Sequence, residues 1–210
     1  MQWVELTAMK LLLDTKKEDG KMKIGVLSLQ GGVIEHINAI LSLGHEAIEV
    51  KTLENLKNID ALILPGGEST TIGKLLKITE LLNPLRKMIQ NGLPVWGTCA
   101  SMILLAKNIE NEETTHLGVM DITVKRNAYG TQLDSFTTNT IIKEISKSPI
   151  ELVFVRAPYI TDVNPNISII ATLDNNIVAV RQDNILATSF HPELTNDTSF
   201  LNYFINNIVT

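Results

Sequence analysis

The single cysteine of the chain, Cys99, lies in a segment whose pattern is typical of an activated nucleophile. Gly97–Ser101 (GTCAS) separates an apolar run that predicts a strand, Leu93–Trp96, from one that predicts a helix, Met102–Ala106. A sharp strand-to-helix turn exposes a nucleophile at the edge of a sheet, and small neighbours permit the bend. The N-terminus of the following helix favours the thiolate, which is the reactive form. The alternative is an inert, buried thiol.

A histidine and a glutamate two residues apart form the second candidate group. His191 and Glu193 belong to the segment Phe190–Glu193 (FHPE), which follows a predicted strand over residues 185–190. Side chains two apart in an extended segment point the same way, so the Glu193 carboxylate is expected beside the His191 imidazole, fixing its tautomer. A cysteine, a histidine and an orienting carboxylate are the groups that activate a thiol. A histidine at a strand end is more often structural, and we assign no chemistry to the other three: His36, His45 and His116.

A glycine pair supplies a third candidate segment. Residues 64–71 (LPGGESTT) lead from a predicted strand through Gly66 and Gly67 into a predicted helix. Paired glycines let the backbone turn its N–H groups toward a ligand oxygen, and acyl transfer needs such donors for the oxyanion of its tetrahedral intermediate. The alternative is a plain turn with a helix N-cap at Ser69 or Thr70. A phosphate-binding loop is a weaker option, because no Gly-Lys-Ser/Thr follows.

The elements that must position these residues alternate in the first half of the chain. Short apolar runs predict strands over residues 23–29, 47–50, 60–64 and 93–96. Helical spacing predicts helices over residues 33–43, 70–79 and 84–90, with another beginning at 102–106. Strands that alternate with helices indicate a largely parallel sheet covered on both faces.

The second half is richer in short strands. They are predicted over residues 119–124, 135–140, 152–155, 168–172, 177–181 and 185–190, and turn residues at 174–176 and 183–184 join the last three as hairpins. An apolar-periodic stretch over 200–208 predicts a final helix. The expected fold is therefore a single three-layer α/β domain over residues 22–210. Its central sheet is mixed, largely parallel, and flanked by helices.

The composition excludes several classes of protein. The chain has 210 residues, of which 44% are hydrophobic and 20% charged, as in a globular domain with a sizeable core. Eighteen basic and 23 acidic residues give a formal charge of -5, and no basic stripe forms, so we expect no nucleic-acid partner. One cysteine cannot form an internal disulfide, which suits a reducing cytoplasm.

Residues 1–21 differ from the rest and are treated as an N-terminal extension without an assigned role, for which disorder is one expectation. The apolar run Met9–Leu13 is far too short to span a membrane. The charged stretch Asp14–Lys21 follows it without a small-residue cleavage site, which disfavours a secretory signal. Met22 is a more natural start, and no other span approaches membrane length. We therefore expect a soluble, cytoplasmic protein that has no membrane partner.

Three segments in this order, LPGGEST, GTCA and SFHPELT, resemble the class I, triad-type glutamine amidotransferases. Four more narrow the resemblance to the glutaminase subunit of pyridoxal 5′-phosphate synthase: MKIGVLSLQGG at 22–32, KRNAYGTQLDSF at 125–136, FVRAP at 154–158 and ATSFHPELT at 187–195. The resemblance runs from Met22 to the C-terminus. It implies a glutaminase of the same fold that works without a cofactor or metal ion.

The resemblance also implies roles for the candidate residues. Cys99 would attack the glutamine carboxamide and form a γ-glutamyl thioester. His191 would take the thiol proton and deliver it to the leaving ammonia, while Glu193 orients the imidazole. Backbone N–H groups of Gly67 and Ala100 would bind the oxyanion.

Further residues are implied to hold the substrate, L-glutamine: Gly67, Glu68, Ser69, Arg126, Val155 and Arg156. An arginine suits the α-carboxylate, because its planar fork matches carboxylate geometry. The chain is too short to carry an acceptor-processing domain as well. Ammonia would therefore leave for a separate synthase subunit, with which family members form a large hetero-oligomer.

Two residues depart from the family pattern. Ser101 replaces the usual glycine two residues after the nucleophile, and we expect the turn to survive with slightly tighter packing. Thr131 replaces an arginine, which would weaken a local contact or the partner interface. Since a free glutaminase wastes glutamine, we also expect activity to depend on the partner. The Gly66–Gly67 peptide is the expected switch, turning its N–H into the oxyanion hole on docking.

Other interpretations remain open at the level of the sequence. The ammonia acceptor could belong to another pathway, such as that of imidazole glycerol phosphate synthase, although GESTT, RNAYG and FVRAP disfavour this. A non-enzymatic protein of similar fold could use Cys99 as a thiol sensor, but it would not need the His191–Glu193 pair. A pseudo-enzyme that only scaffolds its partner would not need the complete triad.

Overall fold

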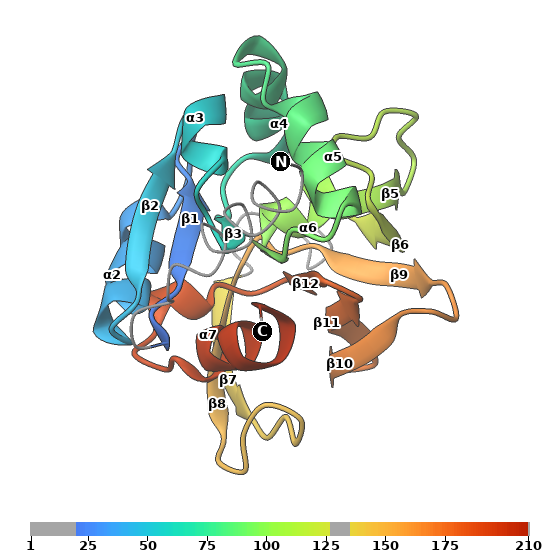
Figure 1. Cartoon of the computed structure of the whole chain (residues 1–210). Helices are drawn as coiled ribbons and strands as arrows, with labels where there is room; N and C mark the ends of the chain where they lie inside the picture. Colours follow the sequence, from blue (N-terminus) through green and yellow to red (C-terminus); the bar gives the residue numbers. More distant parts are fainter. Residues whose placement is uncertain (1–19, 127–134, 210) are drawn as a thin grey trace, which may run out of the picture.

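The computed structural model describes residues 20–126 and 135–209, which surround a mixed β-sheet (Figure 1). In these residues the strand order of the sheet is β2-β1-β3-β4-β12-β11-β9-β6-β5. The first five strands of this order are parallel to one another: β2 (Glu46–Val50), β1 (Lys23–Leu27), β3 (Ala61–Leu64), β4 (Val95–Thr98) and β12 (Ile185–Thr188). This parallel half carries the segments that precede the candidate cysteine and the candidate histidine.

The rest of the sheet is mostly antiparallel. β11 pairs antiparallel with β12, β10 and β9, and β9 pairs antiparallel with β6, while β6 and β5 are parallel. These strands are β11 (Asn176–Gln182), β10 (Ser168–Leu173), β9 (Tyr159–Val163), β6 (Met120–Lys125) and β5 (Ala106–Ile109). A separate hairpin, β7 (Ser135–Thr140) with β8 (Ile150–Val155), projects at the bottom of Figure 1. The sequence prediction of a mixed, largely parallel sheet is confirmed.

Helices pack on both faces of the sheet, so that the sheet separates two hydrophobic cores. One core contains side chains of α4 (Ser69–Ile78), α5 (Leu82–Gln90) and α6 (Ala100–Leu105), and the short α3 (Leu53–Leu56) contributes Leu56. The other contains side chains of α2 (Val33–Ser42), α7 (Ser199–Phe204) and the β7–β8 hairpin. Side chains of a strand alternate between the faces of a sheet. In β3, accordingly, Leu62 and Leu64 join the first core, whereas Ala61 and Ile63 join the second.

The structure adds elements that the sequence patterns did not predict. These are α3, β5 and β9. The helix expected to begin at 102–106 starts at Ala100 and ends at Leu105, because Ala106 pairs with Met120 as the first residue of β5. Such pairing is tertiary, so it overrides the helical preference of a short apolar run. The final helix continues past α7 as a π-helix, Ile205–Val209.

The predicted hairpins are present, and their turns have the expected chemistry. Asp174 and Asn175 between β10 and β11, and Asp183 between β11 and β12, have positive φ values of 48°, 64° and 49°. Asn and Asp tolerate this left-handed region better than other residues with a side chain. Thr131 and residues 1–19 lie outside the described residues, so the predictions made for them stay predictions.

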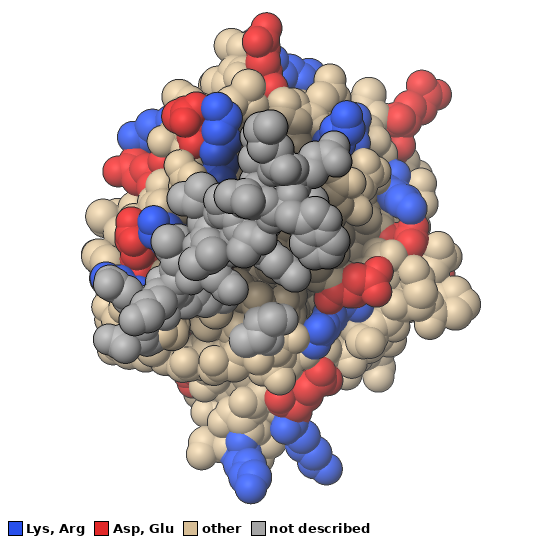
Figure 2. Space-filling view, viewed as in Figure 1, with Lys and Arg blue, Asp and Glu red and all other residues tan. Residues whose placement is uncertain are grey.

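Neither sign of charge dominates the face of the molecule seen in Figure 2, and the described residues contain no membrane-spanning helix. Figure 2 shows basic and acidic side chains interspersed over the visible face, apart from the area of the residues that are not described. Within residues 20–126 and 135–209, every helix is too short or too polar to cross a bilayer.

Candidate active site

Cys99 occupies a strained turn between β4 and α6. Its φ of 47° and ψ of −113° lie in a region that residues with a side chain rarely adopt. The Cys99 N–H donates to the Thr188 carbonyl at 2.8 Å, which fixes the turn against β12. A Cβ atom on Gly97 would lie 3.0 Å from the Ser101 carbonyl oxygen, so this glycine permits the bend. The predicted sharp turn from strand to helix at Cys99 is confirmed.

The parallel pairing of β4 with β12 brings the candidate histidine to the cysteine. Thr98, at the end of β4, is in register with Thr188, at the end of β12. Carboxyl ends of parallel strands meet at one edge of a sheet, so the segments after them, which carry Cys99 and His191, emerge together. The large sequence separation of the two residues is therefore closed by strand pairing alone.

His191 and Glu193 form the contact expected from the sequence, but the backbone differs from the expected one. His191 Nδ1 lies 2.7 Å from Glu193 Oε1. The segment is not extended, because Pro192–Leu194 forms a 3₁₀ turn that folds Glu193 back onto the imidazole. The prediction of the pair is confirmed, and the argument from an extended strand is wrong.

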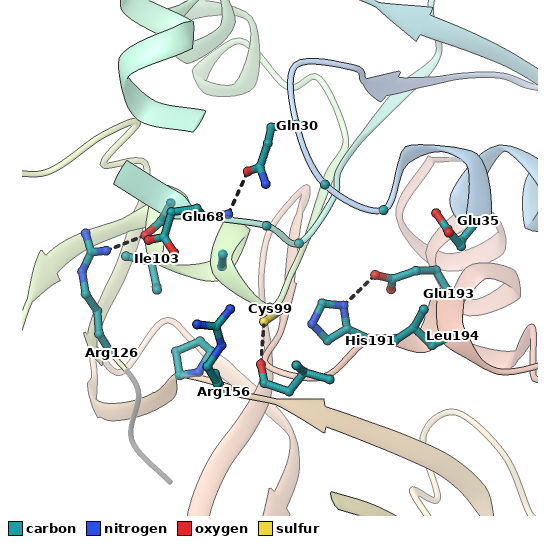
Figure 3. Close-up of a pocket in the computed structure, with 18 residues that line it drawn as sticks. Gln30, Glu35, Glu68, Cys99, Ile103, Arg126, Arg156, His191, Glu193 and Leu194 are labelled. Atoms are coloured by element: carbon teal, nitrogen blue, oxygen red, sulfur yellow. Dashed lines mark hydrogen bonds and ion pairs between the residues drawn. The ribbon is translucent and has the colours of Figure 1, made fainter. Parts of the chain in front are cut away.

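Cys99 and His191 face each other beside Gly66 (Figure 3). A Cβ atom on Gly66 would lie 3.1 Å from Cys99 Cβ and 2.6 Å from His191 Cε1, so both side chains border the same point. Burial lowers the pKa of His191, but hydrogen bonding and charge interactions with Cys99 and Glu193 outweigh it and raise the pKa to about 10. This favours an imidazolium held between the Cys99 sulfur and the Glu193 carboxylate.

We expect the His191 imidazolium to keep its proton at pH values far above those at which a histidine usually loses it. In an NMR titration its midpoint is expected near pH 10, because Cys99 and Glu193 both stabilise the charged ring. An unperturbed histidine titrates at about 6.5. Cys99→Ala is expected to lower the midpoint while leaving the Glu193 contact in place. A wild-type midpoint at or below about 6.5 contradicts the ion-pair arrangement.

Glu193 is buried, and its second oxygen faces a histidine that the sequence analysis did not use. Glu193 Oε2 lies 3.4 Å from His36 Nε2, and only 2% of the His36 surface is exposed. Burial raises the pKa of Glu193, but the His191 hydrogen bond and the two neighbouring imidazoles hold it below its usual value. Helical spacing contained the signal for His36, which falls between Val33 and Ile40 on the apolar face of α2.

The glycine loop packs directly on the cysteine turn. The Gly66 N–H donates to Thr98 Oγ1 at 3.0 Å, and the Gly66 carbonyl accepts from the Gly32 N–H at 3.3 Å. Ser101 adds a third tie, since its hydroxyl donates to the Pro65 carbonyl at 2.6 Å. The serine at this position therefore contributes a buried hydrogen bond, while the expected tighter packing stays a prediction.

All ten residues predicted for the site line one pocket of about 410 Å³. They are Gly67, Glu68, Ser69, Cys99, Ala100, Arg126, Val155, Arg156, His191 and Glu193. A volume of this size is in the range of small-molecule sites. Figure 3 shows Cys99 between Arg156 and His191, with Glu193 on the far side of the imidazole. The pocket thus combines a cysteine, a histidine–glutamate pair and two arginines.

The polar wall of the pocket is preorganised by contacts that the sequence did not reveal. Arg126 Nη1 donates to Ser69 Oγ at 2.6 Å, and Arg126 Nε lies 2.5 Å from Glu112 Oε1. On the other side, Gln30 Oε1 accepts from the Glu68 N–H at 2.8 Å. Gln30 and Glu112 come from loops without a chemical pattern of their own, so only the fold identifies them.

Comparison with known proteins gives a consistent result over nearly the whole chain. The model of the SNO glutamine amidotransferase family matches residues 26–210. A relative from Clostridium beijerinckii, named pyridoxal 5′-phosphate synthase subunit PdxT, is 64% identical over 184 residues, which cover 88% of this chain and 97% of the relative. A relative from Clostridium kluyveri with the same name is 58% identical over 185 residues, covering 88% of this chain and 98% of the relative.

Solved structures agree with the sequence relatives. A crystal structure of a glutamine amidotransferase superposes with a TM-score of 0.82 at 43% identity, covering 87% of this chain and 96% of that chain. The structure of PurLQS from Thermotoga maritima reaches a TM-score of 0.61 at 16% identity, covering 87% of this chain and 99% of that chain, and it supports the fold alone. Because the family model and both relatives cover most of its length, the chain belongs to the SNO glutamine amidotransferase family.

Proposed function

We propose that this chain hydrolyses L-glutamine to L-glutamate and ammonia, and that the ammonia passes to the synthase subunit of a pyridoxal 5′-phosphate synthase. The observation that carries the proposal is the alignment of Cys99, His191 and Glu193 along one wall of the pocket. The names of the relatives from two Clostridium species support the acceptor.

The first half of the reaction forms a thioester. The Cys99 thiolate attacks the side-chain carbonyl carbon of glutamine, and the N–H groups of Gly67 and Ala100 bind the oxyanion that develops. The His191 imidazolium then donates its proton to the departing nitrogen, the C–N bond breaks, and ammonia leaves. Glu193 stabilises the imidazolium from its other ring nitrogen, 2.7 Å away.

The second half releases glutamate. His191, now neutral, takes a proton from a water molecule, whose oxygen attacks the thioester carbon. The collapse of this intermediate breaks the C–S bond and restores the Cys99 thiolate and the His191 imidazolium. Atoms balance, because one water and one glutamine give one glutamate and one ammonia. The strained backbone at Cys99 keeps the sulfur at the pocket in both halves.

The substrate is held by the polar side of the pocket. We assign the α-carboxylate of glutamine to Arg126, whose guanidinium is fixed by Ser69 and Glu112. Glu68 and the backbone of Val155 and Arg156 complete the glutamine site. Arg156 has a positive φ of 46°, a strained conformation of the kind that concentrates at functional sites.

Partner dependence is part of the proposal. The Gly66 carbonyl accepts a hydrogen bond from the Gly32 N–H, so turning the Gly66–Gly67 peptide would break this contact. Docking of the synthase subunit would compensate for the lost bond and present the Gly67 N–H to the oxyanion. A large hetero-oligomer in the cytoplasm is the expected setting.

The test is ammonia release from glutamine, measured for the chain alone and with purified synthase subunit. We expect the rate to rise at least about 10-fold with the partner, since one oxyanion donor contributes roughly 10²–10³-fold to a rate. Equal rates in both samples exclude the peptide switch. If ammonia appears in neither sample, the glutaminase assignment itself is wrong.

A second acceptor is less well supported. A glutaminase that serves imidazole glycerol phosphate synthase would need the same triad, so the geometry of the pocket does not separate the two. The relatives named as pyridoxal 5′-phosphate synthase subunits favour the first acceptor. Stimulation of ammonia release by the corresponding partner protein distinguishes them directly.

A further inference from the structure

His36 is a buried, titratable side chain that the proposed reaction does not use. It lies on α2 and is absent from the lining of the pocket that contains Cys99. Its Nε2 atom lies 3.4 Å from Glu193 Oε2 and 3.3 Å from Thr98 Oγ1. Apart from this contact with His36, Glu193 Oε2 has no hydrogen-bond partner among the described residues.

We propose that His36 is a positioning residue for the triad, which acts as a neutral Nε2–H donor to Glu193 Oε2. The inference rests on the proposed glutaminase function and extends it by a fourth side chain. Glu193 has one oxygen on His191 and the other directed at His36, so the carboxylate is held at both ends. Rotation of the Glu193 carboxylate would break both contacts, and its orientation toward His191 is thereby fixed.

The chemistry of the contact determines the tautomer of His36. An ionised carboxylate only accepts hydrogen bonds, so the facing nitrogen must carry a hydrogen. Burial lowers the pKa of His36 more strongly than the nearby Glu193 charge raises it, and the His191 charge lowers it further, while Glu35 raises it. His36 is therefore neutral. A neutral donor leaves the charge of Glu193 available to stabilise the His191 imidazolium.

His36 also connects the triad to the glycine loop. Thr98 Oγ1, 3.3 Å from His36 Nε2, accepts the Gly66 N–H at 3.0 Å. Thr98 directly precedes Cys99 in the chain and is itself fully buried. The His36 imidazole therefore contacts both Glu193 and Thr98, and Thr98 in turn holds the glycine loop at Gly66.

The surroundings hold the His36 ring in place. Its centroid lies 6.0 Å from that of Trp96 in an edge-to-face arrangement of 73°. Trp96 is fixed in turn by a hydrogen bond from its Nε1–H to Thr188 Oγ1 at 3.1 Å. Hydrogen bonds from residues behind a site orient the groups that carry out the chemistry. The alternative is that His36 has a purely structural role and only fills space in the core.

Two substitutions separate these roles. His36→Leu keeps an apolar volume but removes the donor, whereas His36→Gln keeps an N–H donor close to the position of Nε2. For ammonia release by the complex with the synthase subunit, we expect His36→Leu to lower kcat about 10–10²-fold with little change in KM. His36→Gln is expected to recover most of this loss. Equal losses in the two variants, or an unchanged kcat in His36→Leu, would overturn the proposal.

A second measurement is independent of turnover. In an NMR titration, His36→Leu is expected to lower the midpoint of His191, because a freely rotating Glu193 stabilises the imidazolium less. Ile40→Ala is the matched control: Ile40 is fully buried on the same helix, so its truncation lowers the thermal midpoint without moving the His191 titration. A His191 midpoint that moves equally in both variants means that His36 only fills space. If the wild-type complex releases no ammonia, the glutaminase proposal fails, and the titration still decides the role of His36.

Discussion

Cys99→Ala is expected to abolish ammonia release by the complex, with a loss of at least roughly 10³-fold. The substitution removes the atom that forms the thioester, and no other thiol exists in the chain to replace it. The remaining oxyanion donors and binding groups would support only slow hydrolysis by water. The measurement is the rate of ammonia and glutamate formation at saturating glutamine.

Two observations control this experiment. Glutamine binding should survive, because the proposed substrate contacts of Arg126 and Ser69 do not involve the sulfur. In the wild type, mass spectrometry of acid-quenched samples should detect a glutamyl adduct that maps to Cys99 and is missing in the variant. Retained hydrolysis in Cys99→Ala, at a rate within tenfold of the wild type, rules out the proposed nucleophile.

Gly66→Ala is expected to lower kcat by about 10²-fold or more while the protein still folds. The added Cβ atom would lie 2.6 Å from His191 Cε1 and 3.1 Å from Cys99 Cβ, which is too close for both. The His191 ring must therefore shift from its position beside Cys99. A displacement of about 1 Å in a catalytic group can cost roughly 10²-fold in rate.

Gly44→Ala provides the matched control for this variant. Gly44 has a positive φ of 81° and open space around its Cα, so alanine there strains the backbone without touching the pocket. We expect Gly44→Ala to lower the thermal midpoint and to keep the full rate of ammonia release. If Gly66→Ala retains wild-type kcat, the close approach of His191 to this loop is not required for the chemistry.

The parallel half of the fold and its strand–helix turns could be predicted from local patterns. The runs that became β1, β3 and β4 are short, apolar and bounded by glycine or proline, so their neighbours in sequence are enough to identify them. The cysteine turn could be predicted for the same reason. β9 (YITDV) could not, because two of its five residues are polar and its pairing partners lie far away in the chain.

The residues of the site also divide into those that local sequence patterns predict and those that only the fold brings together. The triad residues have distinctive types and neighbours, whereas the assignments of Arg126 and Val155–Arg156 depended on resemblance to a family. His36 was missed because a histidine on the apolar face of a helix is normally a core residue, and its contact with Glu193 is created by packing of α2 against the 3₁₀ turn. The contact between His191 and Glu193 was predicted from a strand geometry that the chain does not adopt there.

The insertion of β12 between β4 and β11 has a consequence for biosynthesis of the protein itself. The ribosome completes the cysteine turn long before it adds β12. Until residues 185–193 are made, Cys99 has neither His191 beside it nor the Thr188 carbonyl that fixes its backbone. Under the proposed mechanism, a nascent chain that ends before residue 185 therefore lacks His191 and Glu193, and we expect it not to hydrolyse glutamine.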